Sequence, residues 1–373
     1  MKAKRVVTVL LPAVSGLSRN LVRGIADYAE QQGDWHLVLE LYGMVQDENF
    51  RAIQKGDGIL TESILPTSPL PSPRWKIPLV GMQNQRLLKH GPVVSSDNVA
   101  MGRMAGEYFV EKGMTHLAYV SYAEGNQSEQ GLRQVAAEKN LELKSYYLGN
   151  EKPHLDPTAR RRLWQWFENL PAPTGILFRD DQLAHKLMNL LPREWVPERL
   201  ALLGIGDDPL VCDLCRPRLS SMARDGRSIG RKAAELLHRL MDGEDLPFTT
   251  HLMPPGQIVE RASTGIDYTP DPLVTKAVRW INDHLAEATT VEEICRAVRT
   301  PRRSLERRFT ETLGRTVWQE RRHRQIRKAK ELLRHTDKPL GWISDACGFG
   351  SPQQFSRTFT QEVGTNPRRY RRG

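Results

Sequence analysis

The chain is poor in cysteine and has no long apolar run, and each absence narrows what it can be. Four cysteines in 373 residues do not make a disulfide framework. Cys212 and Cys215 have redox or metal spacing, but no second pair or histidine cluster accompanies them, so neither kind of site is expected. No apolar segment approaches the roughly 18–20 residues of a membrane span. The length instead predicts a globular protein of two or three domains.

The motifs of the common enzyme classes are missing as well. Gly204-Ile-Gly206 follows a predicted strand, but no third glycine completes a dinucleotide fingerprint. The chain has no Gly-Lys-Ser/Thr phosphate loop and no Gly-x-Ser-x-Gly elbow. We therefore expect no catalytic residue, no cofactor and no metal. Acidic residues after the predicted strands are interpreted as helix caps or ligand acceptors.

The N-terminal segment, residues 1–16, mimics a signal peptide, with a basic end, an apolar run and small residues. Pro12 cuts the run short, and the same pattern is typical of a buried parallel strand that enters a Gly/Ser loop. We interpret it as a strand. The protein is accordingly expected in the cytoplasm, with no membrane partner.

Positive charge is concentrated in the last quarter of the chain. Residues 271–373 hold 22 Lys+Arg and 12 Asp+Glu, which accounts for the whole net charge of +10. The preceding residues are neutral overall. This asymmetry is typical of a neutral body joined to a module that binds a polyanion. Proline and glycine interrupt the pattern at residues 265–272, so we predict domains at 1–266 and 267–373.

Two segments of the basic quarter share one pattern of core residues, an arginine and a final glycine. The matching residues are Leu305, Arg307, Phe309 and Gly314 in the first copy and Phe355, Arg357, Phe359 and Gly364 in the second. Each copy follows a shorter predicted helix after a tight turn, which indicates a helix-turn-helix. Thr300-Pro301 and Ser351-Pro352 are expected to begin the two reading helices, with the hydroxyl residue as cap and proline in the first turn.

A basic helix is predicted between the copies, from Thr316 to His335. Its length of about 30 Å is close to the ~34–36 Å of one duplex turn. Either copy alone could be an ordinary helix pair with a solvated basic face. Two copies with matched caps, matched arginines and a helical spacer favour a protein that reads double-stranded DNA in successive major grooves.

This quarter also resembles the DNA-binding domain of AraC-type transcription regulators. The residues that carry the resemblance are Ile343, Ala346, Gly348-Phe349, Ser351, Phe355, Arg357, Phe359, Gly364, Pro367 and Tyr370-Arg371. The base-contacting positions that it implies are Arg303, Glu306 and Arg307 in the first repeat and Gln353, Gln354, Ser356 and Arg357 in the second. It further implies direct-repeat-like DNA sites, a homodimer and RNA polymerase as a partner. Asn366 replaces the hydroxyl residue that usually precedes Pro367.

Residues 5–265 alternate short apolar runs with helical stretches, which predicts parallel sheets with crossover helices. Predicted strands are 5–11, 36–41, 58–60, 79–81, 116–121, 175–178 and 200–205, and predicted helices are 17–32, 99–112, 181–191 and 228–242. Polar residues and glycine gather after the strand ends. In open α/β sheets these ends line the ligand crevice.

The body resembles the two-lobed sugar-sensing domain shared by LacI-type repressors and periplasmic binding proteins. The residues that carry the resemblance are 93–98 with Gly102, 113–120, 175–182, 196–197 and 203–208. The implied fold class is a two-lobed, periplasmic-binding-protein-like α/β domain followed by an all-α domain with two helix-turn-helix motifs. That order, together with residues 253–255 and 258–264, is similar to the family of xylose-operon activators.

Ligand contacts are expected at charged residues beside the strand ends. Asp97 and Asp180 are predicted acceptors, Arg19 and Asp207 are further candidates, and Asp181 is expected to cap its helix while remaining a candidate. These acceptors favour a ligand with hydroxyl groups, or a cation, over an anionic sugar acid.

Two positions depart from the family at the expected pocket. Ser128 stands where the family usually has an arginine, and Gly206 stands where it usually has a carboxylate. The resemblance therefore implies a sugar-like effector but does not support xylose. We predict a small-molecule-controlled transcription regulator, resembling an activator of carbohydrate-utilisation genes. The alternatives are a regulator whose sensor no longer binds a sugar and an enzyme fused to a DNA-targeting module.

Overall fold

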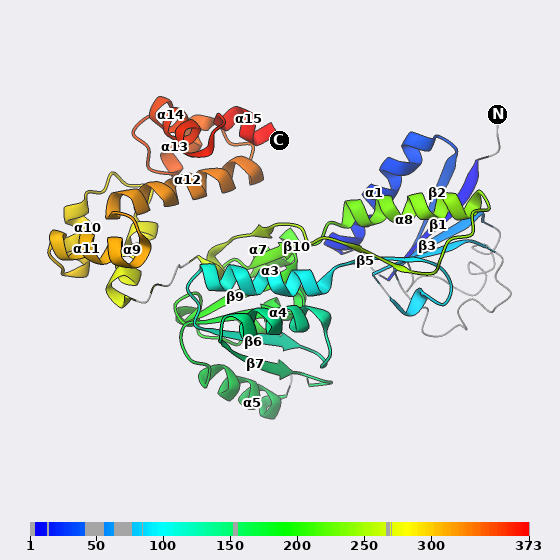
Figure 1. Cartoon of the computed structure of the whole chain (residues 1–373), viewed down its shortest axis with the longest axis horizontal. Coiled ribbons are helices and arrows are strands. Elements are labelled where there is room, and N and C mark those ends of the chain that lie inside the picture. Colours follow the sequence, from blue (N-terminus) through cyan, green and yellow to red (C-terminus); the bar gives the residue numbers. More distant parts are fainter. Residues whose placement is uncertain are drawn as a thin grey trace.

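The computed structural model describes residues 4–12, 15–41, 56–62, 77–83, 85–151, 156–265, 269 and 271–372. Two lobes, each built on a parallel sheet, are followed by a helical domain (Figure 1). None of the helices within these residues is long and apolar enough to cross a membrane. The predicted fold class is confirmed.

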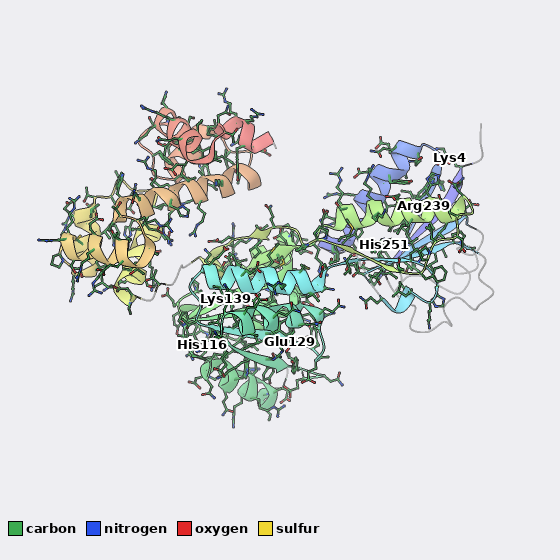
Figure 2. All side chains as sticks on the ribbon, viewed as in Figure 1. Lys4, His116, Glu129, Lys139, Arg239 and His251 are labelled. Carbon is green, nitrogen blue, oxygen red and sulfur yellow. The ribbon has the colours of Figure 1, made fainter. Side chains whose placement is uncertain are left out.

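The first lobe has a six-stranded sheet in the order β11-β5-β4-β3-β1-β2. All its strand pairs are parallel. The strands are β1 Arg5–Leu11, β2 Trp35–Leu41, β3 Gly58–Thr61, β4 Leu79–Met82, β5 Val93–Ser96 and β11 Thr250–Met253. Helices α1 (Gly16–Gln32) and α8 (Gly226–Met241) bury their apolar faces against it in one core. His251 and Arg239 belong to this lobe (Figure 2).

The second lobe has a six-stranded sheet in the order β12-β10-β9-β8-β6-β7, parallel except at the β10–β12 pair. Its strands are β6 His116–Ser121, β7 Glu142–Tyr147, β8 Thr174–Phe178, β9 Leu200–Gly206, β10 Ser220–Ala223 and β12 Ile258–Val259. Its helices are α3 Asn98–Glu111, α4 Gln127–Glu138, α5 Pro157–Glu168, α6 Asp181–Met188 and α7 Pro209–Leu214. Glu129, labelled in Figure 2, ties α4 to β7 because its carboxylate accepts from the hydroxyls of Ser145 and Tyr147.

The chain passes between the lobes three times. It leaves the first lobe after β5 to form α3, returns after β10 to form α8, and leaves again between β11 and β12. These three connections form the hinge region between lobes that each have cores of their own.

Helices α3 and α4 pack at unusually short range through two glycines. A Cβ atom on Gly102 would lie 1.9 Å from the carbonyl oxygen of Ser128, and a Cβ on Gly131 would lie 1.9 Å from that of Val99. No other residue type fits at either position. This contact fixes α3, which begins at the hinge, to the second lobe.

The helical domain holds two small cores joined by one long helix. Its helices are α9 Pro272–Asp283, α10 Val291–Val298, α11 Arg302–Leu313, α12 Val317–His335, α13 Leu340–Ala346, α14 Pro352–Val363 and α15 Pro367–Arg372. The first core gathers α9, α10 and α11, and the second gathers α13, α14 and α15. Val317 at the start of α12 belongs to the first core, while Ile326 and Leu333 belong to the second. Each core therefore contains one helix-turn-helix.

The predicted strands are confirmed to within one or two residues, and the main helices likewise, except that α6 ends at Met188 rather than at 191. The predicted start of the first reading helix is wrong. Helix α11 begins at Arg302 with Pro301 as its N-cap, and the Thr300 hydroxyl donates to the carbonyl of Val298 instead of capping. The cap at Ser351 is confirmed. The proposed boundary between residues 266 and 267 lies outside the described residues.

Candidate functional site

A cavity of about 610 Å³ lies between the two lobes. That volume is within the usual range of small-molecule sites, roughly 300–1,000 Å³. The lining residues are Pro12, Ser15, Gly16, Leu17, Glu62, Gln83, Asn98, Asn126, Arg179, Asp180, Asp181, Gln182, Ile205, Gly206, Asp208, Val211 and Arg224. They follow the carboxyl ends of strands in both lobes, as the sequence predicts for a ligand crevice.

The first lobe contributes one carboxylate, Glu62, which directly follows β3. Its Oε2 atom accepts from the Ser18 hydroxyl at 3.1 Å. Burial raises the pKa of this carboxyl above its usual value, and the Ser18 hydrogen bond and nearby Arg224 oppose the shift. The first lobe therefore places a carboxylate in the cavity, and its ionised form is disfavoured unless a ligand donates a hydrogen bond to it.

The second lobe contributes a pair of adjacent aspartates with different tasks. Asp180 is the N-cap of α6, since its Oδ1 accepts from Leu183 N–H at 2.8 Å, and its Oδ2 pairs with Arg179 at 2.9 Å. Asp181 is only 3% exposed and accepts from the Ser221 hydroxyl and the Asp208 N–H. Burial raises the pKa of Asp181 to about 6. The expectation that Asp181 caps α6 is wrong, because Asp180, one residue earlier, accepts the capping hydrogen bond from Leu183 N–H.

The hinge contributes Arg224, which follows β10, and Asn98, which begins α3. Arg224 Nη1 donates to Asn98 Oδ1 at 3.1 Å. Burial lowers the pKa of Arg224, and the nearby Arg179 guanidinium lowers it further. The β5–α3 and β10–α8 connections between the lobes are therefore joined at the Arg224 guanidinium, which lines the cavity.

The structure explains both departures from the family pattern. Gly206 has a φ of +134°, and a Cβ there would lie 3.0 Å from Oδ2 of Asp181. A side chain is disfavoured at this position because the buried Asp181 carboxylate already occupies the space. Ser128 is buried and does not line the cavity. Its hydroxyl donates to Asn126 Oδ1 at 2.9 Å, and Asn126 faces the cavity instead.

Of the predicted ligand residues, Asp180 and Asp181 line the cavity and three do not. Asp97 caps α3 by accepting from Ala100 N–H, and Asp207 pairs with Arg261 at 2.8 Å. Arg19 lies 3.6 Å from Asp208, a cavity residue. The lining residues that sequence reasoning missed include Glu62, Gln83, Asn126 and Arg224, whereas Asn98 and Asp208 belong to the polar segments predicted to line the crevice. For Glu62 a signal was available, because it is a charged residue directly after β3.

The first reading helix, α11, turns its apolar residues inward and its basic residues outward. Leu305 and Phe309 are fully buried, while Arg303 and Arg307 are exposed. Glu306 is partly buried, and its Oε2 accepts from the backbone N–H of Val317 at 3.1 Å. The carboxylate of Glu306 therefore also helps to begin α12.

The second reading helix, α14, repeats this arrangement. Phe355 is fully buried, Arg357, Gln353 and Gln354 are exposed, and Ser356 is partly exposed. Gln354 is partly engaged, because its Oε1 accepts from Gly350 N–H at 3.0 Å. Gly314 and Gly364 adopt the left-handed backbone conformation and end the two helices. The matched glycine positions are thus confirmed as helix stops.

The connecting helix α12 is less exposed than its composition indicates. Arg324 is buried against Glu320 and donates to Asn282 Oδ1 at 3.0 Å. Arg321 is also buried and donates to Thr289 and to the Glu287 carbonyl. These two arginines hold α12 to the first core and are therefore not available to DNA.

A second hollow, of about 830 Å³, opens beside α14. Gln353 and Ser356 line it together with Asn366, Arg368 and Arg371. Asn366 caps α15 through Arg369 N–H at 2.8 Å, so its amide replaces the usual hydroxyl. The arginines around this hollow suit a phosphate group beside α14. Sequence reasoning missed Arg368 and Arg371 as part of this surface.

The sensor touches the connecting helix at a shared carboxylate. Glu260, just after β12, lies 2.7 Å from Lys112 at the end of α3 and 3.7 Å from Arg327 on α12. Arg279 on α9 pairs with Glu198, and Asn282 donates to the Gly265 carbonyl. Helix α3 thus has one end at the cavity and the other beside the DNA-reading part of the chain.

Comparisons with known proteins agree with this architecture. Residues 107–264 match the family described as a periplasmic binding protein-like domain, and residues 294–373 match a helix-turn-helix domain. The xylose operon regulatory protein of Escherichia coli (strain K12) is 31% identical over 384 residues, covering 98% of this chain and 96% of the relative. That of Haemophilus influenzae is 27% identical, covering 98% and 97%.

The fold also matches a solved structure over its full length. The structure of a xylose-binding transcription activator, XylR, has a TM-score of 0.70 and 28% identity, covering 100% of this chain and 98% of the other. On this similarity, and on the paired helix-turn-helix motifs that follow a two-lobed sensor, the chain belongs to the family of the xylose operon regulatory proteins, AraC-type transcription regulators with a periplasmic-binding-protein-like sensor domain.

Proposed function

We propose that the protein is a cytoplasmic homodimer that activates carbohydrate-utilisation genes when a sugar-like effector closes the sensor lobes. It acts by binding and not by catalysis. Its targets are direct-repeat-like DNA sites, each read by α11 and α14 of one chain, and it recruits RNA polymerase from there. The names of the relatives support this, since they include xylose operon regulators and the transcriptional activator RhaS.

The observation that carries the proposal is the position of α3. Its first residue, Asn98, lines the cavity, and Lys112, which follows its last turn, contacts Glu260 beside Arg327 of α12. An effector that contacts both lobes favours the closed arrangement by its differential affinity. Closure moves α3 with the second lobe. The shared carboxylate then transmits that movement to the helix that sets the spacing of the two readers.

The homodimer is supported by an apolar surface on α7. Leu210 and Leu214 are 68% and 64% exposed and four residues apart, so they lie on one face of this helix. We take this pair as the candidate dimer contact, since contiguous exposed apolar surface is typical of protein interaction sites. Because α7 begins directly after the cavity residue Asp208, a dimer contact here would respond to lobe closure.

The function is tested by selecting bound sequences from random DNA duplexes with the full-length protein. We expect two related half-sites about one helical turn apart. Footprinting on the selected DNA is then repeated with a panel of pentoses, hexoses, sugar acids and sugar phosphates. A change in DNA affinity or footprint with at least one compound is expected. Selection of no common sequence would contradict the proposal.

A further inference from the structure

The charged groups of the cavity are not equally available to a ligand. Asp180 is paired with Arg179 at 2.9 Å. Asp208 accepts from the backbone N–H groups of Gly16 and Leu210 and faces Arg19 at 3.6 Å. Both carboxylates are therefore neutralised by protein groups before any ligand arrives.

The two remaining acidic residues are costly to ionise or already engaged. Both oxygens of Asp181 accept hydrogen bonds from the protein, and the side chain is almost fully buried. Burial raises the pKa of both Asp181 and Glu62. Full ionisation of either carboxyl group inside the cavity is therefore disfavoured.

Arg224 differs from these acidic residues, because it forms no ion pair with a described carboxylate. A guanidinium has five N–H donors. Within the described part of the chain, Arg224 bonds to the neutral amide of Asn98, and no described carboxylate lies within ion-pair distance of 4.0 Å. Burial disfavours the charge of Arg224, and so does Arg179, the second guanidinium of the cavity. Asp180, Asp181 and Glu62 act in the opposite direction but form no ion pair with it. An anion bound directly to the guanidinium would supply the close partner that these carboxylates do not.

We propose that the effector is a small polyhydroxylated anion, a sugar acid or a sugar phosphate, whose anionic group binds Arg224. Asn98, at the start of α3, fixes the guanidinium towards the cavity through their hydrogen bond. Planar guanidinium groups bind carboxylate and phosphate in two-pronged fashion. The hydroxyls of the ligand donate to Glu62 and bond to the amides of Gln83 and Asn126, which also line the cavity. Because Glu62 belongs to the first lobe and Arg224 to the hinge, one ligand holds both.

This assignment reverses the preference expected from the aspartates alone. The sequence shows the acidic residues near the strand ends, but it does not show that two of them are neutralised by arginines. Nor does it show that Arg224 enters the cavity. The inference rests on the proposed function, because it names the chemical class of ligand for the same sensor.

The test compares neutral sugars with their own acids and phosphates by calorimetry on the full chain. The sets are D-xylose and D-xylonate; D-glucose, D-gluconate and D-glucose 6-phosphate; and D-galactose and D-galacturonate. We expect at least one acid or phosphate to bind about 10- to 100-fold tighter than its neutral parent, as one charge-assisted contact provides. Comparing carboxylates with phosphates separates the two sources of the anion.

Substitutions then locate the contact. Arg224→Gln should reduce the affinity for the anion to that for the neutral parent, while Arg224→Lys should retain part of the difference. Arg23→Gln is the matched control, since Arg23 is an exposed arginine on α1 that likewise donates to an asparagine, Asn20. A far-ultraviolet circular dichroism spectrum of Arg224→Gln that matches the wild type would show that the variant is folded.

Two results would overturn the assignment: a neutral parent that binds at least as tightly as its acid and phosphate, or no binding by any anion of the panel. Failure of the proposed function has a different signature. There the anion binds by calorimetry, and Arg224→Gln removes that binding, but the footprint on DNA does not respond.

Discussion

Arg307 and Arg357 test the arrangement of two readers in one chain most directly. Both side chains are exposed on the outer faces of α11 and α14, while Phe309 and Phe359 on the same helices are fully buried. Arg307 has one weak protein contact, to Glu311 at 4.0 Å, which is worth about 0–1 kcal/mol. Truncation of either arginine to alanine should therefore leave the free energy of unfolding nearly unchanged.

The cost should instead fall on DNA recognition. A two-pronged arginine–guanine contact contributes about 1–3 kcal/mol of discrimination, or roughly 5- to 150-fold in affinity for the correct base. The 19 residues of α12 span about 28 Å, and the cores at its two ends hold the readers apart. Arg307→Ala and Arg357→Ala should each relax base choice in a different half-site, about one helical turn apart.

The assay is competition footprinting of full-length variants on selected DNA with each base pair substituted in turn. Arg302→Ala is the control, because Arg302 lies on the same helix but is ion-paired with Glu292. It should weaken binding to all sequences alike and keep the base preferences. If both reader variants lost preference at the same base pairs, or behaved like the control, the two-reader arrangement would be refuted.

Four further outcomes are expected. Glu260→Gln should leave effector binding intact but abolish the effector's influence on DNA affinity, since it removes the negative charge shared by Lys112 of the sensor and Arg327 of α12; a normal response in footprinting would count against this route. Phe355→Ala should destabilise the second helix-turn-helix by about 3–5 kcal/mol in urea unfolding, because the ring is fully buried between two other aromatic rings. The pKa of Asp181 is higher in the folded chain (about 6) than in the unfolded chain. The free energy of unfolding should therefore fall by up to about 3 kcal/mol as pH rises from about 4 to 6, and Asp181→Asn should remove this dependence. A flat wild-type profile would contradict this. Leu214→Glu should shift the dimer towards monomer in sedimentation without changing effector affinity, whereas an unchanged dimer would move the contact away from α7.

Much of the fold was predictable because its signals are local. Apolar runs and helical periodicity gave the positions of the predicted strands and helices, and the capping box of Thr290 with Glu293 fixes the start of α10 in the same local way. The prediction of helix caps failed where two neighbouring residues both suited the cap position. Both Asp180 and Asp181 suit a cap, and their order relative to the end of β8 decided which one caps α6. Thr300 lost its expected role because Pro301 takes the N-cap position and the helix begins at Arg302.

The candidate site was less predictable, because its residues come from distant positions. Ser221 reaches Asp181 only because β10 lies beside β9 in the second sheet. Arg224 meets Asn98 only because two crossings of the chain run together at the hinge. Nothing within a few residues of Arg224 separates it from an ordinary surface charge.

The sequence by itself determined the two kinds of domain, the duplicated reading helices and the charge that attracts DNA, since each depends on residue spacing and composition along one segment. The tertiary structure decided which charges remain available. It buried Arg321 and Arg324 of the connecting helix, paired Asp180 and Asp208 with arginines, and left Arg224 in the cavity. The physical reason is that the availability of a charge depends on its solvent exposure and on the groups within a few ångströms. Contacts between distant segments, such as Arg224 with Asn98 and Arg19 with Asp208, set part of both and arise only in the folded chain.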